Sequence, residues 1–153
     1  LVTAGCDFIQ IDEPVWVGYP QDMPWLVQTF NKLVEGFNAK IALHVCYGNY
    51  QLKKLFTGQY AELFPAILET HTQQICLEFA VSDGVGLELF QQYKTDKEIA
   101  VGVIDVKDEK IESPEVVAQR GEDVDCPGLR HEVYAARARV WETQGDGGRG
   151  ADC

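Results

Sequence analysis

Four short hydrophobic runs recur along the chain, and each stops at polar residues or a turn. They cover residues 7–11, 40–45, 74–79 and 98–104. Nearly continuous apolar runs of this length are typical of strands buried on both faces, as in parallel sheets. The pattern therefore predicts four parallel strands.

Segments with helical spacing separate these runs. Residues 25–37 predict a helix because their apolar positions recur at intervals of three and four. These positions are Leu26, Phe30, Leu33, Val34 and Phe37. Residues 60–68 read as helical turns, and residues 87–93 predict a further helix. Ser113 followed by Pro114 is a typical helix start, with Ser at the N-cap and Pro at the first helical position.

Strands that alternate with helices predict an α/β fold in which helices cover a parallel sheet. Four such units favour part of a (β/α)₈ TIM barrel, which takes about 250 residues when complete. In a chain of 153 residues, we expect the C-terminal half of such a barrel over residues 1–141. Within it, residues 132–141 predict a last helix. The glycine-rich segment 142–153 is expected to be a disordered tail.

Composition narrows the classes of function. The net charge is −11 and the sequence pI is about 4.6, which argues against nucleic acid and against an anionic membrane surface. No apolar run approaches the roughly 20 residues of a transmembrane helix. The chain opens without Met or a secretory signal, so we expect it to be the interior of a longer reading frame.

Cysteine usage indicates a reducing compartment. The five cysteines are odd in number and do not cluster as in a small disulfide scaffold, so we expect a cytoplasmic protein. Cys6 and Cys76 lie among apolar residues and are predicted to be buried structural thiols. Cys153 lies in the polar tail and is expected to be inert.

Donors for a soft metal ion stand at the ends of the predicted strands. His44 and Cys46 close the second run, Glu78 closes the third, and Cys126 follows late in the chain. The carboxyl ends of parallel strands meet at one edge of a sheet. One imidazole, two thiolates and a carboxylate can fill a tetrahedral Zn²⁺ shell. The alternatives are a hydrogen-bonded histidine, a buried cysteine and a salt bridge from Glu78.

Other polar residues near strand ends allow two interpretations. Asp12 and its neighbour Glu13 either bind a cationic group or cap the turn that follows. Asp105 and Lys107 follow the fourth run and fit a simple ion pair. The remaining histidines, His71 and His131, are predicted at helix edges or in loops, with solvated roles.

Taken together, these segments resemble the C-terminal catalytic domain of cobalamin-independent methionine synthase. The matching segments are residues 8–14 with the Ile-Asp-Glu-Pro motif, residues 44–48 with the His-x-Cys motif, Glu78, residues 102–105 and residues 111–115. Their order and spacing both match the family. The resemblance covers about residues 5–120 and is more specific than any single motif.

The resemblance implies a (β/α)₈ barrel with a catalytic zinc ion. By this likeness His44, Cys46 and Glu78 correspond to zinc ligands, and Asp12 corresponds to the residue that holds the amino group of homocysteine. The family's last ligand is the cysteine of an Asn-Pro-Asp-Cys-Gly-Leu run. The nearest match is residues 124–129, which makes Cys126 the candidate. No catalytic residue is assigned.

Two departures point to the shorter, single-barrel members of the family. Large two-barrel enzymes have a folate-contacting Glu six residues after the substrate-binding Asp, where this chain has Gly18. They also have a catalytic His where this chain has Lys107. The resemblance therefore leaves the methyl donor open between a methylcorrinoid and methyltetrahydrofolate.

The function implied is a zinc-dependent methyltransferase that activates the homocysteine thiolate and gives methionine. Its activity would be similar to 5-methyltetrahydropteroyltriglutamate–homocysteine methyltransferase. The expected partners are homocysteine and the methyl donor, with no nucleic acid and no membrane. Exposed barrel edges also favour self-association. Two alternatives stay open: a related zinc-dependent alkyltransferase of the coenzyme M type, and an inactive barrel fragment.

Overall fold

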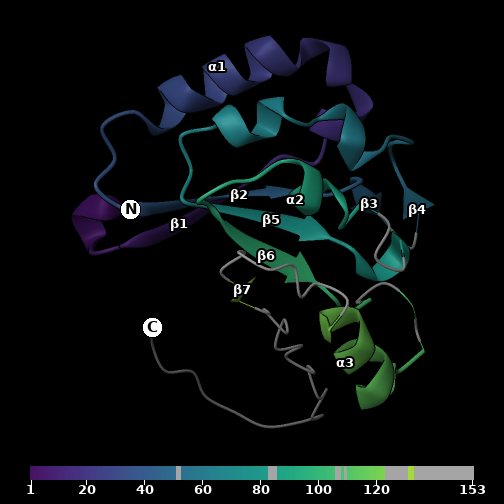
Figure 1. Ribbon diagram of the computed structural model, residues 1–153. Coiled ribbons are helices and arrows are strands. Elements are labelled where there is room, and N and C mark those ends of the chain that lie inside the picture. The colour runs from purple at the N-terminus through teal and green to yellow at the C-terminus, as the bar shows by residue number, and fades with distance from the viewer. Residues whose placement is uncertain (51–52, 83–85, 106–107, 109, 123–130, 133–153) are drawn as a thin grey trace, which may run out of the picture.

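The chain folds around a five-stranded parallel sheet with the strand order β1-β2-β5-β6-β7 (Figure 1). The computed structural model describes residues 1–50, 53–82, 86–105, 108, 110–122 and 131–132. The strands are β1 Phe8–Asp12, β2 Lys40–Val45, β5 Gln74–Glu78, β6 Glu98–Gly102 and β7 His131–Glu132. The sheet does not close within the described residues, so it forms an open part of a barrel.

Helices and turns connect these strands. The α-helices are α1 Met23–Val34, α2 Leu89–Gln92 and α3 Pro114–Glu122. The 3-10 turns are η1 Val2–Ala4, η2 Trp16–Gly18, η3 Pro20–Asp22, η4 Tyr60–Glu62, η5 Ala66–Glu69 and η6 Ala80–Ser82. A small antiparallel hairpin, β3 Asn49–Tyr50 with β4 Lys53–Lys54, follows β2.

The structure confirms the predicted α/β class and the four parallel strands. Helix α1 ends at Val34, before the predicted end, because Glu35 has an extended backbone and Gly36 turns at φ 78°. The turns predicted over residues 60–68 appear as η4 and η5. Ser113 accepts a hydrogen bond from the Val116 N–H at 3.4 Å, as expected of an N-cap.

The end of the chain differs from the prediction. Glu132 was expected to begin a helix, but it pairs with Ala100 in the parallel ladder, and His131 pairs with Ile99. Both residues therefore belong to the short strand β7, which satisfies backbone groups along the edge of β6. The rest of the predicted helix and the tail over residues 142–153 lie outside the described residues.

One face of the sheet makes the hydrophobic core. Alternate residues of β2, Ile41, Leu43 and Val45, are buried there, because successive side chains of a strand point to opposite faces. Helix α1 contributes Val27 and Phe30 to the same core. Figure 1 shows α1 and the turns of residues 60–69 on one side of the sheet.

The opposite face is polar. At the amino ends of the strands Lys40 forms an ion pair with Glu98, and the Gln74 side chain donates a hydrogen bond to Glu98 at 3.0 Å. The Lys40 ammonium also lies 5.3 Å from the centre of the Phe8 ring. These contacts pair the polar groups at the amino ends of the strands with one another. The candidate site residues stand at the opposite, carboxyl ends.

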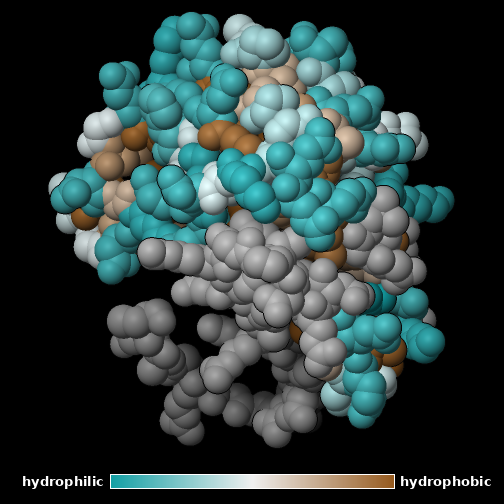
Figure 2. Space-filling view, viewed as in Figure 1, coloured by the Kyte–Doolittle hydropathy of each residue, from teal (hydrophilic) through white to brown (hydrophobic). Residues whose placement is uncertain are grey.

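The surface is mainly hydrophilic on the side shown in Figure 2, with small hydrophobic areas between the polar side chains. Trp25 and Leu33 on α1 are examples of exposed apolar residues. Within the described part of the chain, no helix combines the length and the apolar composition needed to cross a membrane.

A leucine pair tests this division between core and surface. Leu43 is fully buried, whereas Leu33 is 55% exposed. Leu43→Ala should lower the free energy of unfolding by about 2–5 kcal/mol, because it removes buried contacts and leaves a cavity. Leu33→Ala should change it far less. Urea denaturation measures both values, and equal losses would show that β2 is placed wrongly.

Candidate functional site

Strand register places two of the candidate residues, Asp12 and His44, in one row with Cys76 across the sheet. Asp12 on β1 pairs with His44 on β2, and His44 pairs with Cys76 on β5. The Glu13 N–H extends this row by donating to the His44 carbonyl at 2.8 Å. Glu78 lies two residues beyond Cys76 and pairs with Gly102 on β6. All these residues lie at or near the carboxyl ends of their strands.

The His44 imidazole is the centre of this group. Its side chain is hydrogen-bonded to the thiols of Cys46 and Cys76, and these contacts raise the pKa of His44 to about 10, against the lowering effect of burial. The ring nitrogen Nδ1 is buried, and no described residue makes a hydrogen bond to it. Since buried polar atoms normally have partners, this nitrogen is a candidate metal-ligating atom.

The predicted environment of two cysteines was wrong. Cys76 is only partly buried and Cys6 is exposed. Cys76 lies between the core residues Ile75 and Leu77, so strand alternation turns its side chain to the polar face. Cys6 precedes β1, at the opposite end of the strands from His44. Cys76 therefore joins the candidate site, and Cys6 lies away from it.

The hydroxyl of Tyr60 links the carboxyl ends of β2 and β5. This residue was not predicted to belong to the site from the sequence. Its hydroxyl donates to the Val45 carbonyl at 3.0 Å and accepts from the Glu78 N–H at 3.1 Å. Its ring lies 5.0 Å from that of Tyr47 and 5.6 Å from that of Phe79. Tyr60 thereby fixes the backbone on both sides of the site.

Glu78 influences both Tyr47 and Tyr60, whereas Cys46 influences Tyr60. Burial is the largest cause of the raised pKa of Tyr60, and the charges of Glu78 and Cys46 add to it. Burial and the charge of Glu78 also raise the pKa of Tyr47. The charge of Glu78 therefore affects both members of the Tyr47–Tyr60 pair.

Asp12 and Glu13 have different surroundings. Asp12 is exposed and accepts a hydrogen bond from the Gln10 side chain at 2.9 Å. Burial raises the pKa of Glu13, while a hydrogen bond to Trp16 opposes this. The turn that follows, η2, has no side-chain hydrogen bond at its N-cap, Val15. The capping role is therefore not seen, and the Asp12 carboxylate stays accessible on the rim.

A tightly packed loop closes one side of the rim. A Cβ atom at Gly18 would lie 2.4 Å from the Phe56 ring, and one at Gly58 would lie 2.1 Å from the Val17 carbonyl oxygen. The loop after β2 also turns at Gly48, where φ is 61°. At Gly18 and Gly58 a side chain would collide with the facing chain, and at Gly48 the positive φ favours glycine.

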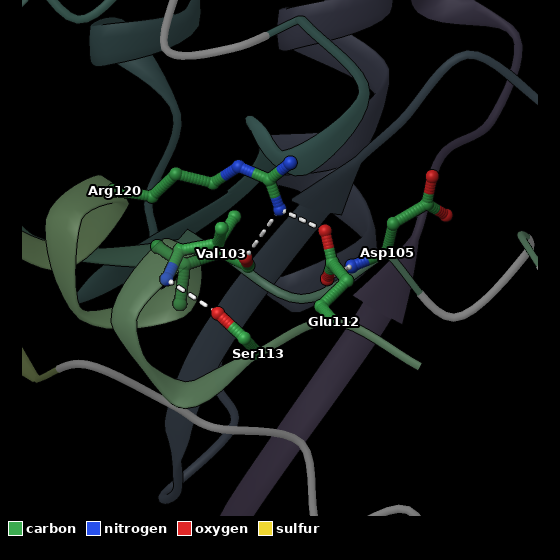
Figure 3. A network of polar contacts seen from close by, with 6 residues as sticks. Val103, Asp105, Glu112, Ser113 and Arg120 are labelled. Atoms are coloured by element: carbon green, nitrogen blue, oxygen red, sulfur yellow. Dashed lines mark hydrogen bonds and ion pairs between the residues drawn. The ribbon is translucent and has the colours of Figure 1, made fainter. Parts of the chain in front are cut away.

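A polar network fixes the chain after β6 (Figure 3). Arg120 on α3 donates to Glu112 at 2.5 Å and to the Val103 carbonyl at 3.1 Å. Glu112 in turn accepts a hydrogen bond from the Asp105 N–H at 2.8 Å. The predicted ion-pair partner of Asp105, Lys107, lies outside the described residues, as does Cys126.

The donor side chains do not form a complete set of metal ligands among the described residues. Within the part of the chain that the structure describes, no three His, Cys, Asp or Glu side chains are grouped closely enough to hold an ion. The donor types nevertheless suit zinc, which accepts imidazole, thiolate and carboxylate ligands. His71 is separate from them, because its N–H donates to the Asn31 side chain at 2.6 Å, beside α1.

A parallel α/β sheet with reactive side chains on its carboxyl rim is the arrangement of barrel enzyme domains. The match to known proteins is more specific. Residues 1–126 match the family model described as the catalytic domain of the cobalamin-independent synthases. The chain belongs to this family.

Curated relatives carry the name methionine synthase. A protein of Saccharolobus islandicus is 39% identical over 118 residues, which are 77% of this chain and 32% of the relative. The Saccharolobus solfataricus relative is 37% identical over the same shares. That of Sulfurisphaera tokodaii is 36% identical over 77% of this chain and 31% of its own length. The chain thus spans about a third of the relatives it matches.

The two hydrogen bonds of the Tyr60 hydroxyl can be tested by substitution. Tyr60→Phe removes one hydroxyl and leaves the Val45 carbonyl and the Glu78 amide without this partner, which should lower the free energy of unfolding by about 1–3 kcal/mol. The Glu78 amide should also exchange its hydrogen faster. Tyr19→Phe, at a 47% exposed tyrosine, is the control. Equal losses in the free energy of unfolding for the two substitutions would contradict a structural role of the Tyr60 hydroxyl.

Proposed function

We propose that the chain is part of a zinc-dependent methyltransferase that transfers a methyl group to the thiol of homocysteine, giving methionine. The single observation that carries this proposal is the contact of the His44 imidazole with the Cys46 thiol, one strand away from the Asp12 carboxylate. The relatives named methionine synthase support the same reaction. Because the chain covers only part of their length, the activity is proposed for the whole protein.

His44, Cys46 and Glu78 would hold the zinc ion, and Cys126 is the sequence candidate for a second thiolate. When bound there, Zn²⁺ would favour the deprotonated form of a substrate thiol and keep it nucleophilic. Tyr60 keeps the backbone of Val45 and Glu78 in place by its two hydrogen bonds. This support limits the reorganisation that the ligands need when a metal ion arrives.

Asp12 would bind the ammonium group of homocysteine. Its carboxylate is exposed on the rim and stands beside His44 in the strand register. A substrate held at its amino end by Asp12 can direct its sulfur atom toward the metal ligands. Such positioning contributes to the rate because the reacting atoms need no further search for alignment.

In the reaction the homocysteine sulfur forms a bond to the methyl carbon while the bond from that carbon to the donor breaks. The leaving atom is nitrogen if the donor is methyltetrahydrofolate and cobalt if it is a methylcorrinoid. The thiol proton passes to solvent before the transfer, and a folate leaving nitrogen takes up a proton from solvent. A reducing compartment such as the cytoplasm is the expected location, because it keeps the ligand thiols reduced.

Metal analysis tests the ligand set. Purified wild-type protein should bind about one equivalent of zinc, and Cys46→Ser should lose most of it, because a serine hydroxyl is a much weaker zinc ligand than a thiolate. Cys6→Ser is the matched control, since Cys6 is exposed and away from the site. Equal zinc contents in wild type and Cys46→Ser would exclude Cys46 as a ligand.

Homocysteine titration tests the role of Asp12. In the whole protein, Asp12→Asn should raise the dissociation constant for homocysteine by roughly 10- to 150-fold, because a charged hydrogen bond contributes about 1.5–3 kcal/mol. The zinc content should stay the same. Asp7→Asn, just before the start of β1, is the control with the same chemical change. Unchanged affinity in Asp12→Asn would exclude it as the ammonium site.

A further inference from the structure

We propose that Gln10 is a positioning residue for the carboxylate of Asp12. This inference rests on the proposed function, in which Asp12 binds the ammonium group of homocysteine. It gives a role to a side chain that neither the sequence analysis nor the names of the relatives assign to the site. By orienting the Asp12 carboxylate, Gln10 favours thiols that carry an ammonium group over thiols that lack one.

The first argument is the contact between the two side chains, which stand on one face of β1. Gln10 and Asp12 are exposed and alternate with the partly buried Ile9 and Ile11, as expected for a strand with one covered face. The Gln10 amide nitrogen donates a hydrogen bond to Oδ1 of Asp12 at 2.9 Å. Because an ionised carboxylate can only accept hydrogen bonds, the amide must turn its nitrogen toward Asp12. The contact therefore has a defined direction.

The second argument is that the sheet already holds the backbone beneath this pair. In the parallel register Gln10 pairs with Ala42 and Asp12 pairs with His44. The Glu13 N–H donates to the His44 carbonyl at 2.8 Å. The freedom left to the Asp12 carboxylate is therefore rotation of its side chain. The hydrogen bond from Gln10 restricts this rotation, and a carboxylate already in its binding orientation loses less conformational entropy when a substrate arrives.

The third argument is that Gln10 restrains the carboxylate without neutralising it. Among the described residues, no Lys or Arg side chain forms an ion pair with Asp12. A cationic partner would compete with the substrate ammonium for the same negative charge. In this part of the chain the neutral amide of Gln10 contacts the carboxylate through Oδ1, which leaves Oδ2 for the substrate. The pair therefore suits a ligand group that is positively charged and donates hydrogen bonds.

Calorimetric titration of the whole, zinc-loaded protein with two thiols tests the inference. Gln10→Leu keeps a side chain of similar size but removes the donor. It should raise the dissociation constant of homocysteine by roughly 3- to 10-fold, the loss expected for one hydrogen bond. The dissociation constant of the desamino analogue of homocysteine, which lacks the ammonium group, should stay the same. Gln21→Leu is the matched control, because Gln21 is exposed and donates to the carboxylate of Asp22, outside the sheet.

A double-mutant cycle separates an effect through Asp12 from an independent one. If Gln10 acts by orienting this carboxylate, Gln10→Leu should have little further effect on homocysteine binding once Asp12→Ala is present. Independent effects would instead multiply the two fold-changes. The zinc content and the urea midpoint of Gln10→Leu should equal those of wild type, because Gln10 is exposed. Unchanged homocysteine affinity in Gln10→Leu, equal weakening of both thiols, or multiplied fold-changes in the double variant would overturn the inference.

The outcomes also separate this inference from the proposed function. If Asp12→Ala binds homocysteine as well as wild type does, the ammonium site of the proposed function fails, and the role of Gln10 fails with it. If Asp12→Ala weakens homocysteine binding and Gln10→Leu does not, the proposed function stands and only the role of Gln10 is wrong.

Discussion

The register between β2 and β5 is the constraint on which the rest of the site depends. It sets His44 beside Cys76, and side-chain alternation then decides which residues enter the core and which face the site. A slip of one residue would exchange the two faces. Leu43, now fully buried, would face the polar side. The burial of the core side chains therefore fixes which side chains of these strands face the candidate site.

Tyr60 adds a second restraint at the end of these strands. Its hydroxyl contacts β2 at Val45 and β5 at Glu78, so the two strands stay in step where the ladder ends. The aromatic contacts with Tyr47 and Phe79 keep its ring in place. A neutral side chain thus makes these two hydrogen bonds beside the candidate site residues.

Much of the fold could be predicted from the sequence because the signals are local. The apolar runs at β2 and β5 are long enough, and their ends polar enough, to identify strands of a covered parallel sheet. Helix α1 was predicted from its spacing, but its end was not, because the break depends on the backbone of Glu35 and Gly36. The short strand β7 exists only through pairing with β6.

The site was only partly predictable for a related physical reason. His44 and Glu78 stand at strand ends, where a polar residue in an apolar run is conspicuous. Cys76 lies inside such a run and reads as one more core residue, since a thiol is nearly apolar. Its face becomes clear only when the register is known. Tyr60 lies 18 residues from Glu78, and no spacing rule links them.

The packing of the rim loop has a consequence for how this sequence can change over time. Phe56 occupies the space next to Gly18, and the Val17 carbonyl lies against Gly58. A mutation that gives position 18 a side chain requires Phe56 to shift or to become smaller. Positions 18 and 56 are thus epistatic, and the order of their substitutions decides which lineages can acquire a polar group there.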